Sequence, residues 1–155
     1  MEYLVRTARI TDIDRLVALS DASARLTRDD GPLAPASLLR QLVYLPQASI
    51  FVAEARREVV GGAVLALRPS VRAGGYVGTV DFLVVDPEHD VERISAALIG
   101  ELLRSAGNKG CTVVEAGHPN DSEERTRWEQ QGFKPADPHM ERAVSAVGAP
   151  ARRAQ

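Results

Sequence analysis

The spacing of apolar residues divides the first third of the chain into one extended stretch and two helical ones. A short apolar run at residues 3–6 predicts a strand, and Thr11 can cap the helix that follows, in which apolar residues share one face. A second helix is predicted over residues 35–44, where Pro35 occupies the first turn and leucines form the apolar stripe. Between the two helices, residues 29–32 predict a loop.

The middle of the chain changes to the apolar and β-branched runs that are typical of strands. Residues 49–55 and 59–67 are joined by a short polar segment, which predicts a hairpin, and the two glycines at 61–62 indicate a bulge or a close approach of another backbone. Residues 68–75 predict a loop, and residues 76–85 predict a further strand. The side chains expected to share one face of that strand are Val77, Thr79, Asp81, Leu83 and Val85.

The last third of the chain predicts a helix over residues 91–106, a buried strand over 111–116 and a charged helix over 121–131, followed by short strands at 133–134 and 139–144. Hairpins followed by a strand–helix–strand unit are typical of a mixed sheet. The sequence therefore predicts an α/β (α+β) fold with a mixed, mostly antiparallel central sheet and helices on both of its faces.

Length and composition limit the class of protein. The chain has 155 residues, which suits a single domain, predicted over residues 1–144, and residues 145–155 predict a disordered tail because they lack large apolar side chains. An apolar content of 45% excludes a disordered acidic chain. Lys+Arg 19 against Asp+Glu 21 gives a net charge of −2, which excludes a general electrostatic attraction to nucleic acid.

Cysteine, histidine and hydropathy narrow the class further. Cys111 is the only cysteine, and the spacing of His89, His118 and His139 does not indicate a shared metal, so neither an internal disulfide nor a metal site is predicted. No apolar run is long enough for a membrane span, and the first residues lack the pattern of a signal peptide. We therefore expect a cytoplasmic protein with no membrane and no nucleic-acid partner.

Four short motifs occur in a set order along the chain. They are IFVAE at residues 50–54, VGGAV at 60–64, LVVDPEH at 83–89 and WEQQGFK at 128–134. Together they resemble the GNAT superfamily of acyl-CoA-dependent N-acetyltransferases, and the resemblance covers residues 3–144. It implies the GNAT fold, in which the central sheet is splayed between its fourth and fifth strands.

The resemblance implies transfer of an acetyl or short acyl group from acetyl-CoA, the co-substrate, to a small-molecule or peptide amine that attacks the thioester directly. It places the backbone amides of Leu83, Val84 and Val85 against the acyl and pantetheine groups, where a bulge or splay in the strand would free them. A carboxylate would remove the amine proton. Asp81 on the same strand is the first candidate and Glu54 on a neighbouring strand is the second; the alternative for each is an ordinary polar residue at a half-solvated position or rim.

The pyrophosphate loop of the family follows the pattern (Gln/Arg)-x-x-Gly-x-(Gly/Ala), which lets backbone N–H groups at a helix N-terminus point at the anion. Asp90 stands here in place of the amide or basic residue, Arg93 replaces the first glycine, and Ser95 is a mild change. The cofactor-binding positions that the resemblance implies in this loop are Asp90, Val91, Glu92, Arg93, Ile94 and Ser95.

Arg93 has two opposing interpretations. Its guanidinium can fold over the pyrophosphate as a clamp, or it can block the cleft or pair with a neighbouring carboxylate. A carboxylate near a phosphate weakens binding of the phosphate, and four carboxylates lie in the eight residues 86–93. They are Asp86, Glu88, Asp90 and Glu92. The acidity of the chain is therefore concentrated where the resemblance places an anion.

Three further positions bear on the implied chemistry. Trp128 stands where the family often has a tyrosine that protonates the departing thiolate; indole has no proton of useful acidity, so Trp128 is interpreted as a core anchor and water as the donor. Asn120 or Asp121 lies near the asparagine that the family has at the start of a helix, with a helix cap as the alternative role. Asp29 and Asp30 fall in the loop that usually borders the acceptor site, where they would attract a cationic amine, or they belong to a solvated loop.

Two hypotheses of function follow. The first is a GNAT-type N-acetyltransferase. The second is a degenerate GNAT-fold domain without acyl-CoA activity, which serves as a ligand-binding or protein-interaction module, because the loop glycine, the basic residue and the tyrosine are all replaced. Members of the family are often dimers, so a homodimer is compatible with the resemblance.

Overall fold

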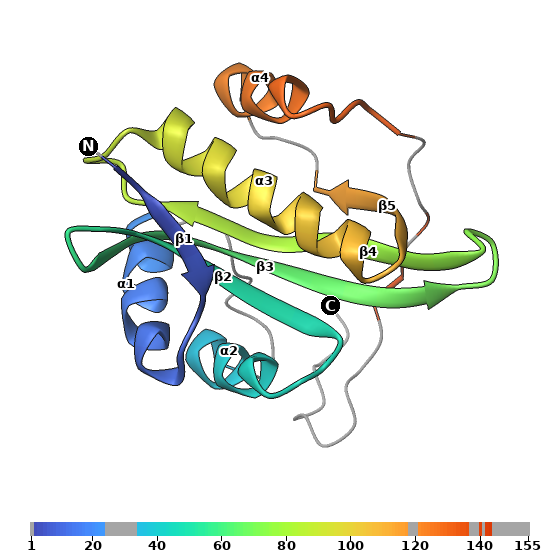
Figure 1. The fold of residues 1–155 in the computed structure, drawn as a ribbon, viewed down its shortest axis with the longest axis horizontal. Coiled ribbons are helices and arrows are strands. Elements are labelled where there is room, and N and C mark those ends of the chain that lie inside the picture. The colour runs from blue at the N-terminus through green and yellow to red at the C-terminus, as the bar shows by residue number, and fades with distance from the viewer. Residues whose placement is uncertain (1, 24–33, 118–120, 137–139, 141, 144–155) are drawn as a thin grey trace, which may run out of the picture.

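The computed structural model describes residues 2–23, 34–117, 121–136, 140, 142 and 143 (Figure 1). Within them the chain forms one five-stranded sheet with helices on both faces. The elements in chain order are β1 (Leu4–Thr7), the 3-10 turn η1 (Ile10–Asp12), α1 (Ile13–Ser23), α2 (Pro35–Val43), β2 (Ala48–Ala55), β3 (Glu58–Ser70), β4 (Gly75–Val85), α3 (Val91–Asn108), β5 (Cys111–Ala116) and α4 (Ser122–Gln130). The predicted tail, residues 145–155, lies outside the described residues.

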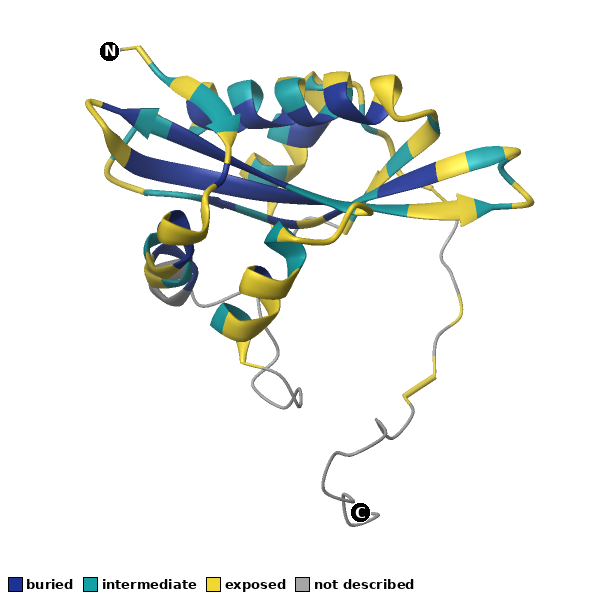
Figure 2. Ribbon diagram, turned by 60° about the horizontal axis from the view of Figure 1, so that its bottom comes forward, coloured by how far each residue is buried: buried dark blue, intermediate teal, exposed yellow. Residues whose placement is uncertain are grey.

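The strands lie across the sheet in the same order as along the chain. β1 to β4 are antiparallel neighbours, whereas β4 and β5 run parallel and are connected through α3. Figure 2 shows α3 on one side of the sheet and α1 and α2 on the other. The predicted mixed, mostly antiparallel sheet with helices on both faces is confirmed.

Each face of the sheet has its own hydrophobic core. On the α3 side, Ile94, Leu98 and Leu102 recur every four residues and are fully buried, and they pack with β3 and with Trp128 of α4. On the other side, Ile13 and Leu16 of α1 are fully buried in a cluster that also contains residues of α2, β2, β3 and β4. The apolar faces of α1 and α3 therefore bury apolar surface, whereas in the predicted leucine stripe of α2 only Leu39 is buried and Leu38 is exposed.

The glycines at 61–62 permit close packing on both faces of β3. A Cβ atom added to Gly62 would lie 2.4 Å from Leu16 Cδ2, and one added to Gly61 would lie 2.9 Å from the Val84 carbonyl oxygen. The β2–β3 register also shifts beside them, where Ala53 pairs with Gly61 and Glu54 with Val59, so Val60 is an extra residue of β3. Both features that the glycine pair predicted, close approach and a bulge, are present.

Half of the loop predicted over residues 68–75 is strand, and only residues 71–74 form a turn. β3 continues to Ser70, and β4 begins at Gly75, so the turn between them is short. Proline is tolerated at position 69 because the β2–β3 register ends at Ala48↔Ala66, which leaves this part of β3 with a free edge. The Pro and Gly signals therefore marked the end of a long hairpin and not a loop.

The closing strand predicted at 133–134 is absent. Phe133 N donates to the Trp128 carbonyl oxygen (3.1 Å), and the Phe133 ring meets the indole edge-on at 4.7 Å, so the chain turns back onto α4 through Gly132 at φ +87°. The other predicted strand, 139–144, falls partly outside the described residues. The residues of it that the structure describes, Met140, Arg142 and Ala143, form no strand.

The start of the first helix also differs from the prediction. Thr11 lies inside η1, and Asp12 provides the cap, since its carboxylate accepts the backbone N–H of Arg9 at 2.7 Å. In the described part of the chain, no helix combines the length and the apolar character needed to cross a membrane.

Candidate functional site

A β-bulge in β4 lies at Asp81. In the β3–β4 register Leu65 pairs with Val80 and Val64 with Phe82, so Asp81 has no partner in β3. Val80 packs in the core on the α3 side, whereas Phe82 packs in the core on the α1 side, although the two are only two residues apart. The single face predicted for residues 77–85 is therefore interrupted, and the Asp81 side chain is exposed.

The sheet opens between β4 and β5 directly after this bulge. The parallel pairing of β4 with β5 ends at Val80↔Ala116, and the rest of β4 has no partner on that side among the described residues. This is the splay between the fourth and fifth strands that the resemblance implied. The opening exposes one edge of β4 from Asp81 to its end.

Two of the three predicted backbone amides face the opening. Asp86 N donates to the Val60 carbonyl oxygen at 2.8 Å, which continues the β3–β4 ladder. Because N–H directions alternate along a strand, the N–H of Val84 also faces β3, whereas those of Leu83 and Val85 face the open edge. Leu83 and Val85 can therefore donate to a bound group, and Val84 stabilises the sheet.

The loop between β4 and α3 satisfies most of its own N–H groups. Asp90 caps α3, with Oδ1 3.2 Å from Arg93 N, and the Asp90 N–H itself points to the Tyr3 hydroxyl oxygen at 3.4 Å. No acceptor for the N–H groups of Val91 and Glu92 is present in the described part of the chain. The positive end of α3 thus offers two free amides and carries a carboxylate beside them.

The acidic residues of this loop are not all free. Asp86 forms an ion pair with Arg15 of α1 at 3.2 Å, and Arg15 also donates to the Val59 carbonyl oxygen at 3.1 Å. Glu88 and Glu92 are exposed and form no ion pair with any described residue. The negative charge near the α3 N-terminus therefore comes mainly from Glu88, Asp90 and Glu92.

Arg93 lies on the ring of Tyr3, which itself contacts the loop at His89 and Asp90. Its guanidinium carbon is 5.4 Å from the centre of the Tyr3 ring, a cation–π contact, and Tyr3 also meets the His89 ring edge-on at 6.3 Å. Tyr3 precedes β1, and its hydroxyl lies against the N-terminus of α3 at Asp90. Arg93 pairs with none of the loop carboxylates, so that part of the blocking interpretation is not observed.

The side chains of Ile94 and Ser95 belong to the fold. Both are buried on the inner face of α3, with exposures of 0% and 3%. They position the helix whose first turn carries the free amides, and their side chains are not available to a ligand.

Glu54 is engaged elsewhere in the structure. Its carboxylate binds Arg6 Nε at 3.0 Å, while the other guanidinium nitrogens bind Asp12 at 2.8 and 3.1 Å. Glu54 is four residues along β2 from Ile50, which is opposite Val64, so it is about 13 Å along the sheet from the bulge and two strands away. The structure does not bring the two candidate bases, Asp81 and Glu54, together.

The Arg6–Asp12–Glu54 cluster was missed by the sequence reasoning. The hydrogen bond from Arg6 holds the pKa of the Asp12 carboxyl below its ordinary value, despite burial, and the same bond raises the pKa of Arg6. The sequence alone gives no signal for this cluster, because Glu54 comes next to Arg6 only through the pairing of β1 with β2. Its role is to fasten β1 and η1 to the sheet.

Of the remaining candidates, some have structural roles and the others lie outside the described residues. Trp128 is buried against Phe133, as expected of a core anchor. Asp121 caps α4 by accepting the N–H of Glu124 at 2.7 Å, in line with the alternative of a helix cap. Asn120, Asp29 and Asp30 lie outside the described residues. Within the described ranges, no three histidine, cysteine or acidic side chains gather in a way that could hold a metal ion.

The comparisons with known proteins agree on the fold. The acetyltransferase of Trypanosoma brucei is 21% identical, with a TM-score of 0.72, and the alignment covers 92% of this chain and 100% of that one. The ribosomal-protein-alanine N-acetyltransferase of Brucella melitensis is 18% identical, with a TM-score of 0.71 and coverages of 94% and 100%. An aminoglycoside acetyltransferase from an uncultured soil metagenomic sample, solved in complex with sisomicin, is 15% identical, with a TM-score of 0.72 and coverages of 92% and 97%.

The family assignment rests on the sequence profile. The profile of the Acetyltransferase (GNAT) family matches residues 13–133, which include β2 to β5, the bulge and the loop before α3. The search of curated proteins found no match. The chain belongs to the GNAT acetyltransferase family. This membership gives it an N-acetyltransferase function with acyl-CoA as co-substrate, and no comparison favours a degenerate binding module.

Proposed function

We propose that the chain transfers an acetyl group from acetyl-CoA, or another short acyl group from the corresponding acyl-CoA, to a cationic amine. The observation that carries this proposal is the open edge of β4, where pairing with β5 ends at Val80 and the N–H groups of Leu83 and Val85 face the opening. A pantetheine arm is an extended chain with amide groups, so it can add to such an edge as a strand would. The residues of the β4 edge therefore fit the donor.

The pyrophosphate end of the donor fits the loop only in part. Val91 and Glu92 offer free N–H groups at the positive end of the α3 dipole, which favours an anion. The Asp90 carboxylate occupies the Arg93 N–H and adds a repulsive charge. We therefore expect acyl-CoA affinity to depend mainly on the β4 edge.

The chain's own residues supply two functions in the transfer. One of the N–H groups of Leu83 and Val85 donates to the acyl oxygen, where negative charge develops as the amine nitrogen bonds to the acyl carbon and the carbon–sulfur bond breaks, and the other donates to the pantetheine arm. Asp81, exposed beside this edge, takes the proton that the amine loses, directly or through one water. Solvent protonates the departing sulfur, since Trp128 is buried and its indole N–H is not acidic.

The acceptor is proposed to be cationic because the acidic groups on its side are uncompensated. Asp81 forms no ion pair with a described residue, whereas the charge of Glu54 is balanced by Arg6. Asp29 and Asp30 remain predicted contacts of the amine. The similar structures include enzymes described as acting on ribosomal-protein alanine and on aminoglycosides, so small and polypeptide amines are both candidates. A cytoplasmic location and a homodimer remain part of this proposal.

Titration calorimetry with acetyl-CoA, followed by mass spectrometry of amine acceptors, tests the proposal. Sisomicin, an alanine-terminated peptide and a linear polyamine form a suitable panel. We expect saturable acetyl-CoA binding, similar binding of desulfo-CoA, and acylation of at least one amine. Absence of binding at millimolar acetyl-CoA would refute the proposal, and binding without acylation of any amine would refute the cationic-amine part of it.

A further inference from the structure

A cavity of about 330 Å³ lies at the other edge of the sheet from the β4–β5 opening. β1 pairs with β2 only as far as Thr7↔Phe51, and Ala8 N then bonds the Ile50 carbonyl oxygen, so β1 leaves the start of β2 uncovered. The C-terminal turns of α2 and α3 flank this stretch. The cavity therefore shares no residue with the proposed acyl-donor site.

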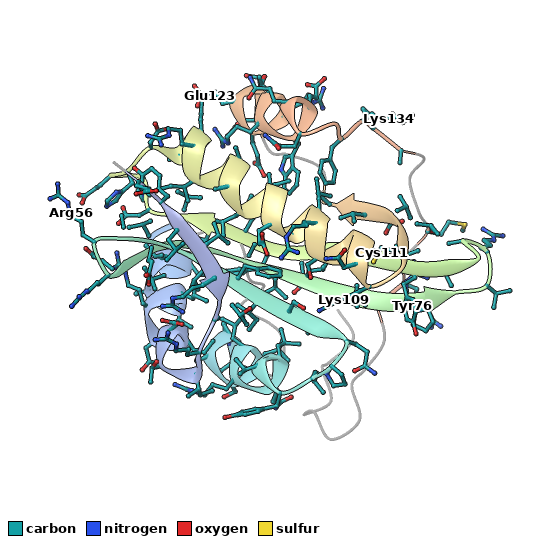
Figure 3. All side chains as sticks on the ribbon, in the orientation of Figure 1. Arg56, Tyr76, Lys109, Cys111, Glu123 and Lys134 are labelled. Carbon is teal, nitrogen blue, oxygen red and sulfur yellow. The ribbon has the colours of Figure 1, made fainter. Side chains whose placement is uncertain are left out.

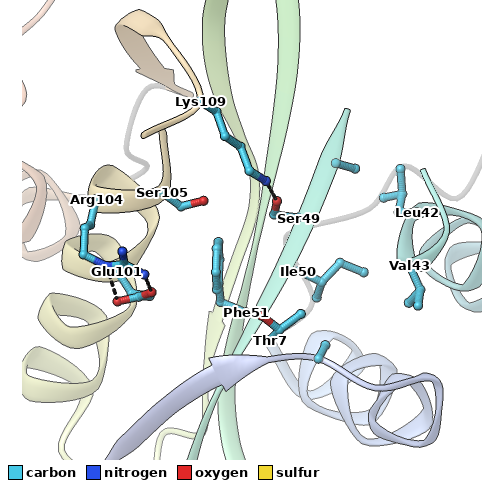
Figure 4. A pocket seen from close by; sticks show the side chains of 12 residues that line it. Thr7, Leu42, Val43, Ser49, Ile50, Phe51, Glu101, Arg104, Ser105 and Lys109 are labelled. Carbon is cyan, nitrogen blue, oxygen red and sulfur yellow. Dashed lines mark hydrogen bonds and ion pairs between the residues drawn. The ribbon is translucent and has the colours of Figure 1, made fainter. Parts of the chain in front are cut away.

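The floor of the cavity is apolar and its rim is polar. Ile50 and Phe51 of β2 are almost fully buried beneath it, with exposures of 3% and 5%, and Leu42 and Val43 of α2 form one wall. Figure 4 shows the Ser105 hydroxyl of α3 directed toward the space between α3 and β2. The remaining lining residues are Thr7, Ala8, Ala48, Ser49, Glu101, Arg104 and Lys109.

One positive charge at the rim is uncompensated. Arg104 is paired with Glu101 one turn earlier on α3. Lys109 is one of only two lysines in the chain, and Figure 3 labels its place in the fold. Its side chain extends from the end of α3 across the mouth of this cavity and donates to the Ser49 hydroxyl (Figure 4). No carboxylate pairs with Lys109 among the residues that the structure describes.

A structural role alone explains part of this arrangement. Lys109 follows α3 directly, and a cation at a helix C-terminus interacts favourably with the helix dipole. That role does not require the ammonium to reach over an apolar hollow to a serine on β2. A purely structural role also predicts that substitution of Lys109 changes the stability of the protein and leaves its affinity for ligands unchanged. Experiments can therefore separate the two roles.

We propose that this cavity binds a small monocarboxylate with an apolar body, such as a branched aliphatic or single-ring aromatic acid. The carboxylate pairs with Lys109 and displaces its bond to Ser49, and the apolar body lies against Phe51, whose side chain is on the same face of β2 as Ser49. The volume is at the lower end of the range for small-molecule sites. One uncompensated cation suits a monoanion better than a phosphate dianion, because a second negative charge would have no partner in the cavity.

The test uses two probes and their neutral analogues on the unmodified protein. Benzoate and 4-methylpentanoate are titrated into ¹⁵N-labelled protein, and binding is followed by NMR spectroscopy of the backbone amides. Benzamide and 4-methylpentanamide serve as matched controls of the same shape. Because a charge-assisted pair is worth about tenfold or more in affinity, we expect saturable binding of the acids and at least tenfold weaker binding of the amides. Amide signals of Ile50 and Ser105 should shift, and those of Leu83 and Val85 should not. Equal binding of acids and amides, or no saturable binding of either acid, would overturn the proposal.

Three variants locate the charge. Lys109→Met keeps the apolar stem and is expected to weaken acid binding at least tenfold, Lys109→Arg to retain most of it, and Lys134→Met, which removes the other, exposed lysine, to leave it unchanged. Equal losses in the Lys109→Met and Lys134→Met variants would contradict the assignment. Acetyl-CoA affinity should be the same in all three, so failure of this site and failure of the donor site are distinguishable.

Discussion

The carboxylate of Asp90 accepts a hydrogen bond from the backbone N–H of Arg93, with Oδ1 and N 3.2 Å apart, and so caps α3, the helix whose N-terminus is the predicted pyrophosphate site. The cap uses an N–H that would otherwise face the anion, and it places a negative charge beside it. If the donor binds at this helix, we expect the structural gain of the cap to be coupled to a loss of affinity for the donor.

Changing Asp90 to asparagine separates these two effects. Asparagine caps a helix about as well as aspartate, so the free energy of unfolding should change little. Loss of the charge removes a repulsion of about 1 kcal/mol, so acetyl-CoA should bind about three- to tenfold more tightly, and the gain should diminish at high salt. Calorimetric titration at two ionic strengths measures both.

The Asp14→Asn variant is the control for this prediction. Asp14 lies on α1, is highly exposed and pairs with Arg40, away from the α3 N-terminus. Its removal should leave the acetyl-CoA affinity unchanged. Equal or weaker binding by the Asp90→Asn variant would show that the carboxylate does not oppose the donor.

Arg93→Gly tests the two interpretations of Arg93 against its observed position. Because the guanidinium lies on the Tyr3 ring, we expect acetyl-CoA affinity to fall by no more than about threefold, the size of a weak, solvent-screened charge effect. A loss of tenfold or more would establish a clamp, and a gain would establish a plug. Thermal unfolding of the same variant should show a modest destabilisation, since glycine weakens a helix.

Asp81→Asn tests the proposed base. The turnover number should fall by about two orders of magnitude or more, as is usual for loss of a general base, while the dissociation constant for acetyl-CoA stays the same. The acidic limb of the pH–rate profile should also disappear. Glu123→Gln on α4, an exposed carboxylate with no part in the proposed chemistry, is the control (Figure 3). A normal turnover number in the Asp81→Asn variant would remove Asp81 from the mechanism.

The bulge shows what the sequence could and could not predict about the site. The alternation of Val77, Thr79, Asp81, Leu83 and Val85 correctly predicted a strand, because apolar periodicity reflects burial. It could not reveal that Asp81 is an extra residue, since a bulge depends on the register with β3. The amide assignments show the same limit: the N–H groups of Leu83 and Val85 face the open edge, as their predicted role requires, but that of Val84 faces the ladder, which only the pairing with β3 decides.

Contacts between distant segments account for most of the remaining differences. The clamp and plug interpretations of Arg93 rest on its place in the family pattern and on its neighbours in sequence, whereas its partner in the structure, Tyr3, is 90 residues away. Phe133 belongs to a family motif and was assigned to a strand, but its packing on Trp128 determines its place. Local propensity predicts elements well and is overruled where tertiary contacts are strong.

The ion cluster at Asp12 predicts a pH-dependent stability. Its folded-state pKa is below the ordinary value because of the hydrogen bond from Arg6, so the stabilisation is complete above about pH 4 and is lost as the pH falls through the folded pKa. Asp12→Asn should destabilise the protein by about 2 kcal/mol at pH 7 and flatten the decline between pH 5 and lower values. Urea unfolding across this range measures it. A similar decline in the Asp12→Asn variant would assign the acid sensitivity to other carboxylates.

Two glycines, Gly62 in β3 and Gly100 in α3, are expected to respond in opposite directions to alanine. A Cβ at Gly62 would lie 2.4 Å from Leu16 Cδ2, and Leu16 is fully buried, so it has little room to move. Gly62→Ala should therefore cost about 1–3 kcal/mol of unfolding free energy, as overpacking does. Gly100 lies on the exposed side of α3 with nothing within 4 Å of an added Cβ, so Gly100→Ala should stabilise by about 0.5–1 kcal/mol through helix propensity. Denaturant unfolding of both variants decides the matter: destabilisation by Gly100→Ala, or a neutral Gly62→Ala, would mean that α1 or α3 packs on the sheet differently from this structure.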